Sequence, residues 1–168
     1  MPSFDTVLNA YHALPESVAS VMLSTVDANG APHASYAPYV MDEAHRLYIF
    51  TSGLSAHTQN LLTTQRAGVL IIEDEANCQQ VFARQRITYD CQAEVIERNS
   101  TLWEERASAF EQRFGEIIQM LRPLGDFQIF CLTPCAGRFI MGFGAAYEVN
   151  PEDLSQLIPK ALGPKSDQ

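Results

Sequence analysis

The sequence has few basic residues and no long hydrophobic run. Eleven Lys and Arg side chains stand against twenty Asp and Glu, giving a formal net charge of −9. This sign is unfavourable for binding nucleic-acid phosphates or anionic lipids, so we expect neither a nucleic-acid nor a membrane partner. No segment stays apolar for the about 20 residues that a membrane helix needs, and the first residues lack the pattern of a signal peptide. These absences predict a cytoplasmic protein.

The cysteines and histidines lack the spacing of a metal site. The four cysteines form no CxxC pair, and no histidine lies near the two that are closest in sequence, Cys131 and Cys135. We therefore expect reduced thiols rather than a zinc site or a disulfide framework. The histidines are equally scattered, at positions 12, 33, 45 and 57. No metal site is predicted.

Several catalytic motifs are also missing. The sequence has no glycine-rich phosphate loop ending in Lys-Ser/Thr, no HExxH and no GxSxG. Residues 142–147, GFGAAY, resemble half of a dinucleotide-binding motif but lack its third glycine. We interpret them as close backbone packing within a strand, at a barrel bend or a subunit contact. No general acid or base stands out, which is consistent with cofactor-borne chemistry and equally with no chemistry.

The composition is that of one folded domain. Of 168 residues, 46% are hydrophobic and 18% charged, which is enough to bury a core without disulfides. We predict a single domain over residues 1–168. Its N-terminal helix covers about 1–14 and ends at Pro15. Its tail, 151–168, begins with a short helix and is flexible.

Between these ends the hydrophobic pattern predicts an antiparallel α+β barrel. Asp27-Ala28-Asn29-Gly30 is a strong hairpin signal, because Asn-Gly accepts the positive φ angles of a tight turn. Regular βαβ alternation is missing, which argues against a doubly wound sheet. The predicted strands cover 18–26, 33–41, 46–51, 68–73, 81–98, 126–132 and 137–149, and the predicted helices about 55–65 and 101–121.

The stretch TSGLSAHTQNL, residues 51–61, places hydroxyl groups, a glycine and a histidine where a strand passes into a helix. The first turn of a helix has unpaired backbone N–H groups, so this segment is either a well-capped helix start or a cradle for an anion. Of the four histidines, only His57 lies in such a neighbourhood.

Five strings in order resemble one known family. They are MLSTVDANGAPHASYAPYV, RLYIFTSGLSAHTQNL, VLIIEDE, FARQRITYDCQAEVI and GRFIMGFGAAYEV. Together they span about residues 15–150 and are similar to the pyridoxamine 5′-phosphate oxidase-related split-barrel family, within it to the haem-utilisation branch. The resemblance implies a six-stranded split barrel with flanking helices, a homodimer, and a cofactor site between subunits. That site holds FMN in most branches and haem in this one.

The resemblance also implies site residues. Three residues would lie closest to a flavin: Ser35, Tyr36 and Ala37. Five would surround its phosphate: Thr51, Ser52, Ser55, His57 and Thr58. The oxidases bind that phosphate with arginine and lysine, whereas this segment offers only His57. In the haem branch a C-terminal histidine binds the iron, and this chain has none after Gly142. Asp126 falls where an acidic residue of that branch supports the histidine across the dimer.

The sequence is therefore consistent with three hypotheses about function. The first is an FMN-dependent oxidoreductase, in which the flavin carries the chemistry. The second is a haem-binding or haem-degrading protein of the same fold. The third is a cofactor-free binding module. Fold alone does not choose among them, because one scaffold hosts many functions.

Overall fold

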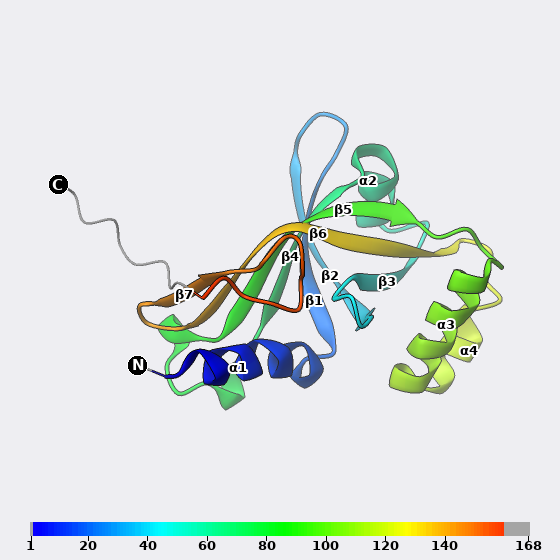
Figure 1. Cartoon of the computed structure of the whole chain (residues 1–168). Coiled ribbons are helices and arrows are strands. Elements are labelled where there is room, and N and C mark those ends of the chain that lie inside the picture. Colours follow the sequence, from blue (N-terminus) through cyan, green and yellow to red (C-terminus); the bar gives the residue numbers. More distant parts are fainter. Residues whose placement is uncertain (1, 160–168) are drawn as a thin grey trace.

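A seven-stranded antiparallel sheet organises the computed structural model, which describes residues 2–159 (Figure 1). The strands are β1 (Ser20–Val26), β2 (Pro32–Met41), β3 (Leu47–Ser52), β4 (Arg66–Ile72), β5 (Arg86–Val95), β6 (Phe127–Gly142) and β7 (Ala145–Glu148). Their order is β3-β2-β1-β4-β5-β6-β7, and β3 also pairs with β6. This last pairing closes six strands into a barrel and leaves β7 as an extension of β6. The predicted six-stranded α+β barrel is confirmed.

The first hairpin forms as its sequence predicts. In β1, Val21, Leu23 and Thr25 are buried, whereas Met22 and Ser24 between them face outward. This is the alternation of a half-buried strand. At the turn, the Asp27 carboxylate accepts hydrogen bonds from the backbone N–H groups of Asn29 and Ala31. Gly30 adopts a φ of 83°, which is costly for other residues.

Helix α1 (Phe4–Ser17) packs on the barrel through Val7, Tyr11 and Leu14. The prediction that Pro15 ends this helix is wrong. Pro15 lies in the last turn, where its missing N–H removes only one hydrogen bond. Its carbonyl group is satisfied from elsewhere, by the Tyr39 hydroxyl at 2.5 Å.

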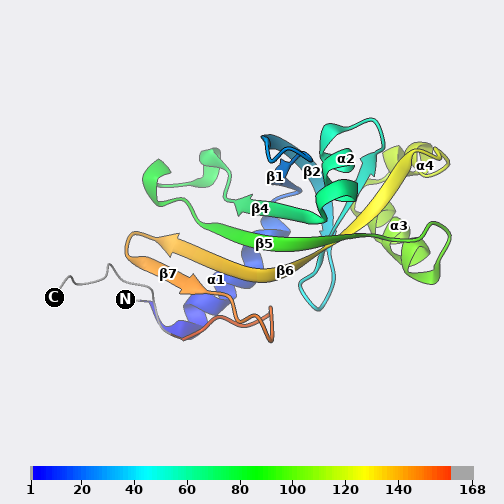
Figure 2. The same ribbon diagram turned by 90° about the horizontal axis from the view of Figure 1, so that it is seen from above.

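The predicted helix 101–121 is two helices, α3 (Thr101–Phe114) and α4 (Glu116–Leu121). They meet at Gly115, whose φ of 74° is incompatible with a continuous helix. Their apolar faces cover a second hydrophobic cluster that includes Phe50, Trp103 and Phe110. Figure 2 shows α3 and α4 at one end of the long β5–β6 ribbon, with α1 and β7 at the other end.

The later strands differ from their predicted bounds. β5 begins at Arg86 rather than 81, because two short 3₁₀ turns, Glu75–Asn77 and Val81–Ala83, precede it. β6 runs continuously where two strands were expected, since a bulge in its pairing with β5 absorbs Pro134 and Cys135. Gly142 is the last residue of β6, and residues 143–144 form the turn between β6 and β7 instead of lying inside a strand.

The part of the tail that is described packs against the barrel. Leu157 is buried and bridges to Val149, and the Tyr11 hydroxyl donates to the Leu154 carbonyl oxygen. Residues 151–159 contain no helix, so the short helix expected there is absent from the described tail. Residues 160–168 lie outside the described part, and the flexibility of the tail stays a prediction.

Candidate functional site

The predicted site lies where β3 ends and α2 (Ala56–Thr64) begins. Two of its residues are structural. The Thr58 hydroxyl donates to the Ser52 carbonyl oxygen at 2.7 Å and lies 2.8 Å from the Thr51 hydroxyl. Both threonines are buried, and this pair ties the helix to the strand.

A second contact joins two residues that the sequence placed in different sites. The Ser52 hydroxyl donates to the Asp126 carboxylate at 2.7 Å. The Gly53 N–H donates to the Asp126 carbonyl oxygen, also at 2.7 Å. A methyl group on Gly53 would stand 3.0 Å from that oxygen, so the close approach depends on glycine. Ser52 and Asp126 thus form one polar unit at the exposed end of β3.

His57 faces β2. One of its ring nitrogens, Nδ1, is 3.1 Å from the Ser35 hydroxyl. The other, Nε2, is buried without a hydrogen-bond partner among the described residues. The pKa of His57 is lowered, first by burial and then by the nearby His33. His57 is therefore the neutral imidazole near pH 7, which is the form that binds a transition metal.

The three residues expected along a flavin do not share one surface. Ser35 and Ala37 lie on the face of β2 that turns toward the barrel interior, and Ala37 is buried there. Tyr36 points outward, with 64% of its surface exposed, opposite the exposed Met22 of β1. Ser35 and Tyr36 therefore point to opposite faces of β2.

The start of α2 offers backbone donors to an anion. Ser55 is the N-cap residue, but its side chain makes no capping hydrogen bond. The N–H groups of Thr58 and Gln59 bond to the Ser55 carbonyl, while those of Ala56 and His57 have no acceptor in the described part of the chain. The charge of the neighbourhood works against a phosphate, because residues 51–64 contain no Lys or Arg and Asp126 adds a carboxylate.

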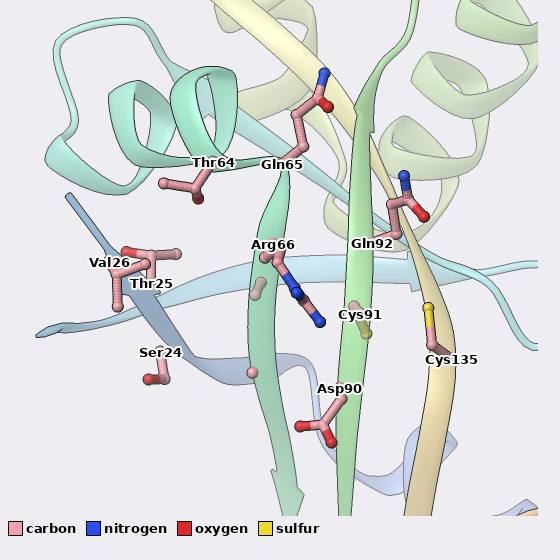
Figure 3. A pocket seen from close by; sticks show the side chains of 12 residues that line it. Ser24, Thr25, Val26, Thr64, Gln65, Arg66, Asp90, Cys91, Gln92 and Cys135 are labelled. Carbon is pink, nitrogen blue, oxygen red and sulfur yellow. The ribbon is translucent and has the colours of Figure 1, made fainter. Parts of the chain in front are cut away.

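Sequence reasoning missed two polar residues of α2 that the structure brings into the site. The Gln59 amide closes the loop by donating to the Gly53 carbonyl, and the Asn60 amide donates to the buried Thr25 hydroxyl. Their partners are 6 and 35 residues away, so no local pattern could have indicated both bonds. A cavity of about 690 Å³ lies past the other end of α2, between Arg66 and Cys135 (Figure 3).

Two wider features bear on function. No group of three or more His, Cys, Asp or Glu side chains within residues 2–159 is arranged to hold a metal ion. The helices of the same part of the chain include none that is long and apolar enough to cross a membrane.

Comparison with known proteins identifies related chains. The pyridoxamine 5′-phosphate oxidase family matches residues 8–141. The heme oxygenase HutZ of Vibrio cholerae serotype O1 is 40% identical over 139 residues, which cover 83% of this chain and 78% of that protein. The crystal structure of HutZ, described as a heme storage protein from Vibrio cholerae, has a TM-score of 0.73 and 34% identity, covering 79% of this chain and 91% of that one. Campylobacter jejuni ChuZ has a TM-score of 0.85 and 29% identity, covering 100% of this chain and 68% of that one. The resemblance drawn from the sequence is confirmed.

Proposed function

This chain belongs to the pyridoxamine 5′-phosphate oxidase family of split barrels, in its haem-utilisation branch, and from that premise we propose that it binds haem. The observation that carries the proposal is the Asp126 carboxylate, which Ser52 holds beside the segment that the family resemblance assigns to the FMN phosphate. The similarity to HutZ supports the same choice, since both descriptions of that relative name heme. The alternative reading of the sequence thus becomes the main one.

The phosphate of FMN is unfavourable in this place. The Asp126 carboxylate repels a phosphate placed beside it, and solvent reduces this repulsion because Asp126 is exposed. The flavin enzymes would offset this with arginine or lysine, and residues 51–64 have neither. FMN remains the second candidate because of the free N–H groups of Ala56 and His57, which face no acceptor.

The residues present fit a haem iron. With no histidine after Gly142, an imidazole ligand has to come from positions 12, 33, 45 or 57. His12 bonds to the Ser155 carbonyl oxygen and stacks edge-on with His45 near α1, away from the α2 site. His33 and His57 are the pair at the α2 site, and the Nε2 of His57 is a buried donor atom without a partner.

The second contact of His57 suits this role. Metal-binding imidazoles normally use their other ring nitrogen in a hydrogen bond that sets the tautomer and the ring orientation. The Ser35 hydroxyl, 3.1 Å from Nδ1, is placed to do this. Haem, when bound, supplies the iron redox and oxygen chemistry. The chain would supply the imidazole, keep it neutral by burial, and present the Asp126 carboxylate at the end of β3.

We also propose that the protein is a homodimer with the cofactor between its two copies, as the family resemblance implies. Exposed apolar side chains on the outer face of β1 and β2, Met22 and Tyr36, are consistent with a covered surface. Sedimentation at micromolar concentration tests this, and a monomer contradicts it.

Titration of the purified protein with haem and, separately, with FMN tests the main proposal. We expect a Soret band that saturates at one haem per chain and weak or no FMN binding. His57→Ala should shift the Soret maximum and weaken haem binding at least about tenfold. His12→Ala is the control, and its Soret maximum should match the wild type. Binding of FMN but not haem would show that the protein is a flavoprotein. Binding of neither would support the cofactor-free binding module.

Haem degradation is a separate step of the same proposal. The two descriptions of the Vibrio relative differ, one naming an oxygenase and the other a storage protein. Adding a chemical reductant in air to the haem complex distinguishes them. Loss of the Soret band with release of iron would indicate degradation, whereas a stable band would indicate storage or transport.

A further inference from the structure

The cavity lined by β1, β4 and β5 has no role in the haem binding that we propose. It has a volume of about 690 Å³, and its walls include Arg66, Asp90, Cys91 and Cys135 (Figure 3). Cys135 also lines a second hollow of about 450 Å³. This thiol therefore stands on a ridge between two concave surfaces, while Cys91 lies in the wall of the first.

The two cysteines are neighbours across the bulge between β5 and β6. Cys91 pairs with Pro134 and Asp90 pairs with Ala136, so Cys135 is the extra residue of β6. Opposed Cα atoms on adjacent antiparallel strands are about 4.5–5.5 Å apart. Disulfides need about 4.4–6.8 Å between Cα atoms, so a bulge residue next to the opposed position is within reach. Figure 3 shows the two side chains on adjacent strands, Cys91 on β5 and Cys135 on β6.

The other two cysteines are placed differently. Cys131 is buried in the cluster under α3, and as it lies four residues along β6 from Cys135 the two are about 13 Å apart. Cys78 follows the first 3₁₀ turn of the β4–β5 connection, and its thiol points to the Glu75 carbonyl oxygen. Neither lines the cavity.

The two thiols differ in exposure, which sets an order of reaction. Cys135 is exposed, whereas only 4% of the surface of Cys91 is accessible. We propose that Cys91 and Cys135 form a redox-sensitive thiol pair, in which a low-molecular-weight disulfide modifies Cys135 and Cys91 then completes a disulfide across the bulge. The bond would tie β5 to β6 in the wall of the cavity.

The chemistry balances as two thiol–disulfide exchanges. The Cys135 thiolate attacks glutathione disulfide, forming a mixed disulfide and releasing one glutathione thiolate. The Cys91 thiolate then attacks the Cys135 sulfur, forming the internal disulfide and releasing the second glutathione thiolate. The two protein thiols lose two electrons and two protons, and one glutathione disulfide becomes two glutathione molecules. Burial raises the pKa of the Cys91 thiol, with a further contribution from Cys135, so the second step is the slow one.

The test uses the reduced full-length protein, glutathione disulfide, intact-mass measurement and peptide mapping without reductant. The wild type should lose two hydrogens, retain no glutathione and yield a Cys91–Cys135 peptide. Cys91→Ser should retain one glutathione on Cys135, and Cys135→Ser should form neither product at this pair. Cys78→Ser is the matched control and should behave as the wild type does.

Two results would overturn the proposal. One is a wild type that keeps its glutathione adduct on Cys135 as Cys91→Ser does, which would show that Cys91 does not attack. The other is a native protein in which Cys78 reacts and Cys135 does not, which would show that a second copy covers the ridge. The release of the adduct should also accelerate about tenfold per pH unit between about pH 7 and 9, and a flat rate contradicts attack by a thiolate of raised pKa.

Discussion

The Ser52 hydroxyl and the Asp126 carboxylate meet at 2.7 Å, joining the end of β3 to the turn before β6. The Gly53 N–H adds a 2.7 Å bond to the Asp126 backbone. Ser52 also accepts from the Leu54 N–H at 3.1 Å, so its hydroxyl is held from both sides. The carboxylate is therefore held in position by the chain itself.

Replacing Asp126 with Asn should strengthen FMN binding and weaken haem binding. The amide keeps the size of the side chain but removes the charge that opposes a phosphate, so FMN affinity should rise about tenfold. Haem binding should weaken and its Soret maximum should shift. Parallel haem absorption and FMN fluorescence titrations measure both. Glu152→Gln, an exposed change in the tail, controls for net charge. Unchanged haem and FMN affinities would show that Asp126 is not part of the cofactor site.

Gly137→Ala should destabilise the barrel strongly. An added methyl group would stand 2.6 Å from the Tyr89 ring and 3.0 Å from Val149, both of which are buried. Overpacking of this kind costs about 1–3 kcal/mol. Gly142→Ala is the matched control, because nothing lies within 4 Å of its added methyl group. Urea unfolding of both variants gives the free energies, and equal values would contradict this packing.

The buried tyrosine pair should respond unequally to loss of either hydroxyl. Tyr11 donates to the Leu154 carbonyl oxygen at 2.7 Å, so Tyr89, 2.6 Å away, is the donor to Tyr11. Tyr11→Phe leaves the Tyr89 hydroxyl and the carbonyl without partners and should cost about 1–3 kcal/mol. Tyr89→Phe leaves the hydroxyl of Tyr11 bonded to the Leu154 carbonyl oxygen and should cost about 0.5–1.5 kcal/mol. The reverse order in chemical denaturation would show that the hydroxyl directions are opposite.

Stability should fall as the pH drops below about 6.5, the unfolded pKa of histidine. Burial lowers the pKa of His45, with a further effect of His12, and burial also lowers that of His57, with a further effect of His33. The unfolded chain therefore binds these protons first, and the contribution of the neutral imidazoles is lost as the pH falls from about 6.5 through their folded pKa values. Unfolding free energies measured between about pH 7.5 and 5 should show the decline.

The control for this pH dependence is His45→Gln/His57→Gln, which should give a flatter profile in the same range. The carboxylates act in a lower window. The pKa of Asp153 is lowered by hydrogen bonds from Ser155, so its contribution is present above the usual Asp pKa of about 3.9 and is lost below it. An undiminished slope in the double variant would assign the decline to groups other than these two histidines.

Much of the fold follows from local sequence. Alternation of apolar and polar residues sets the strand faces, because successive side chains point to opposite sides of a sheet. The Asp27–Gly30 turn forms from its own residues. Two errors, at Pro15 and Gly115, arose at residues with special backbone properties, one at the expected end of a helix and one inside a predicted helix. There the outcome depends on what supplies the hydrogen bonds beyond the helix.

The site depended on tertiary structure. Sequence alone selected Ser52, His57 and Asp126, but it placed Asp126 apart from Ser52. Closure of the barrel through the β3–β6 pairing brings Ser52 to Asp126, 74 positions later, and the packing of α2 on β2 brings His57 to Ser35, 22 positions earlier. Periodicity describes which way a side chain points along its own element. Which distant side chain it meets, and whether water or a ligand still reaches it, is decided only when the elements pack together, because burial and hydrogen-bond pairing are properties of the assembled barrel.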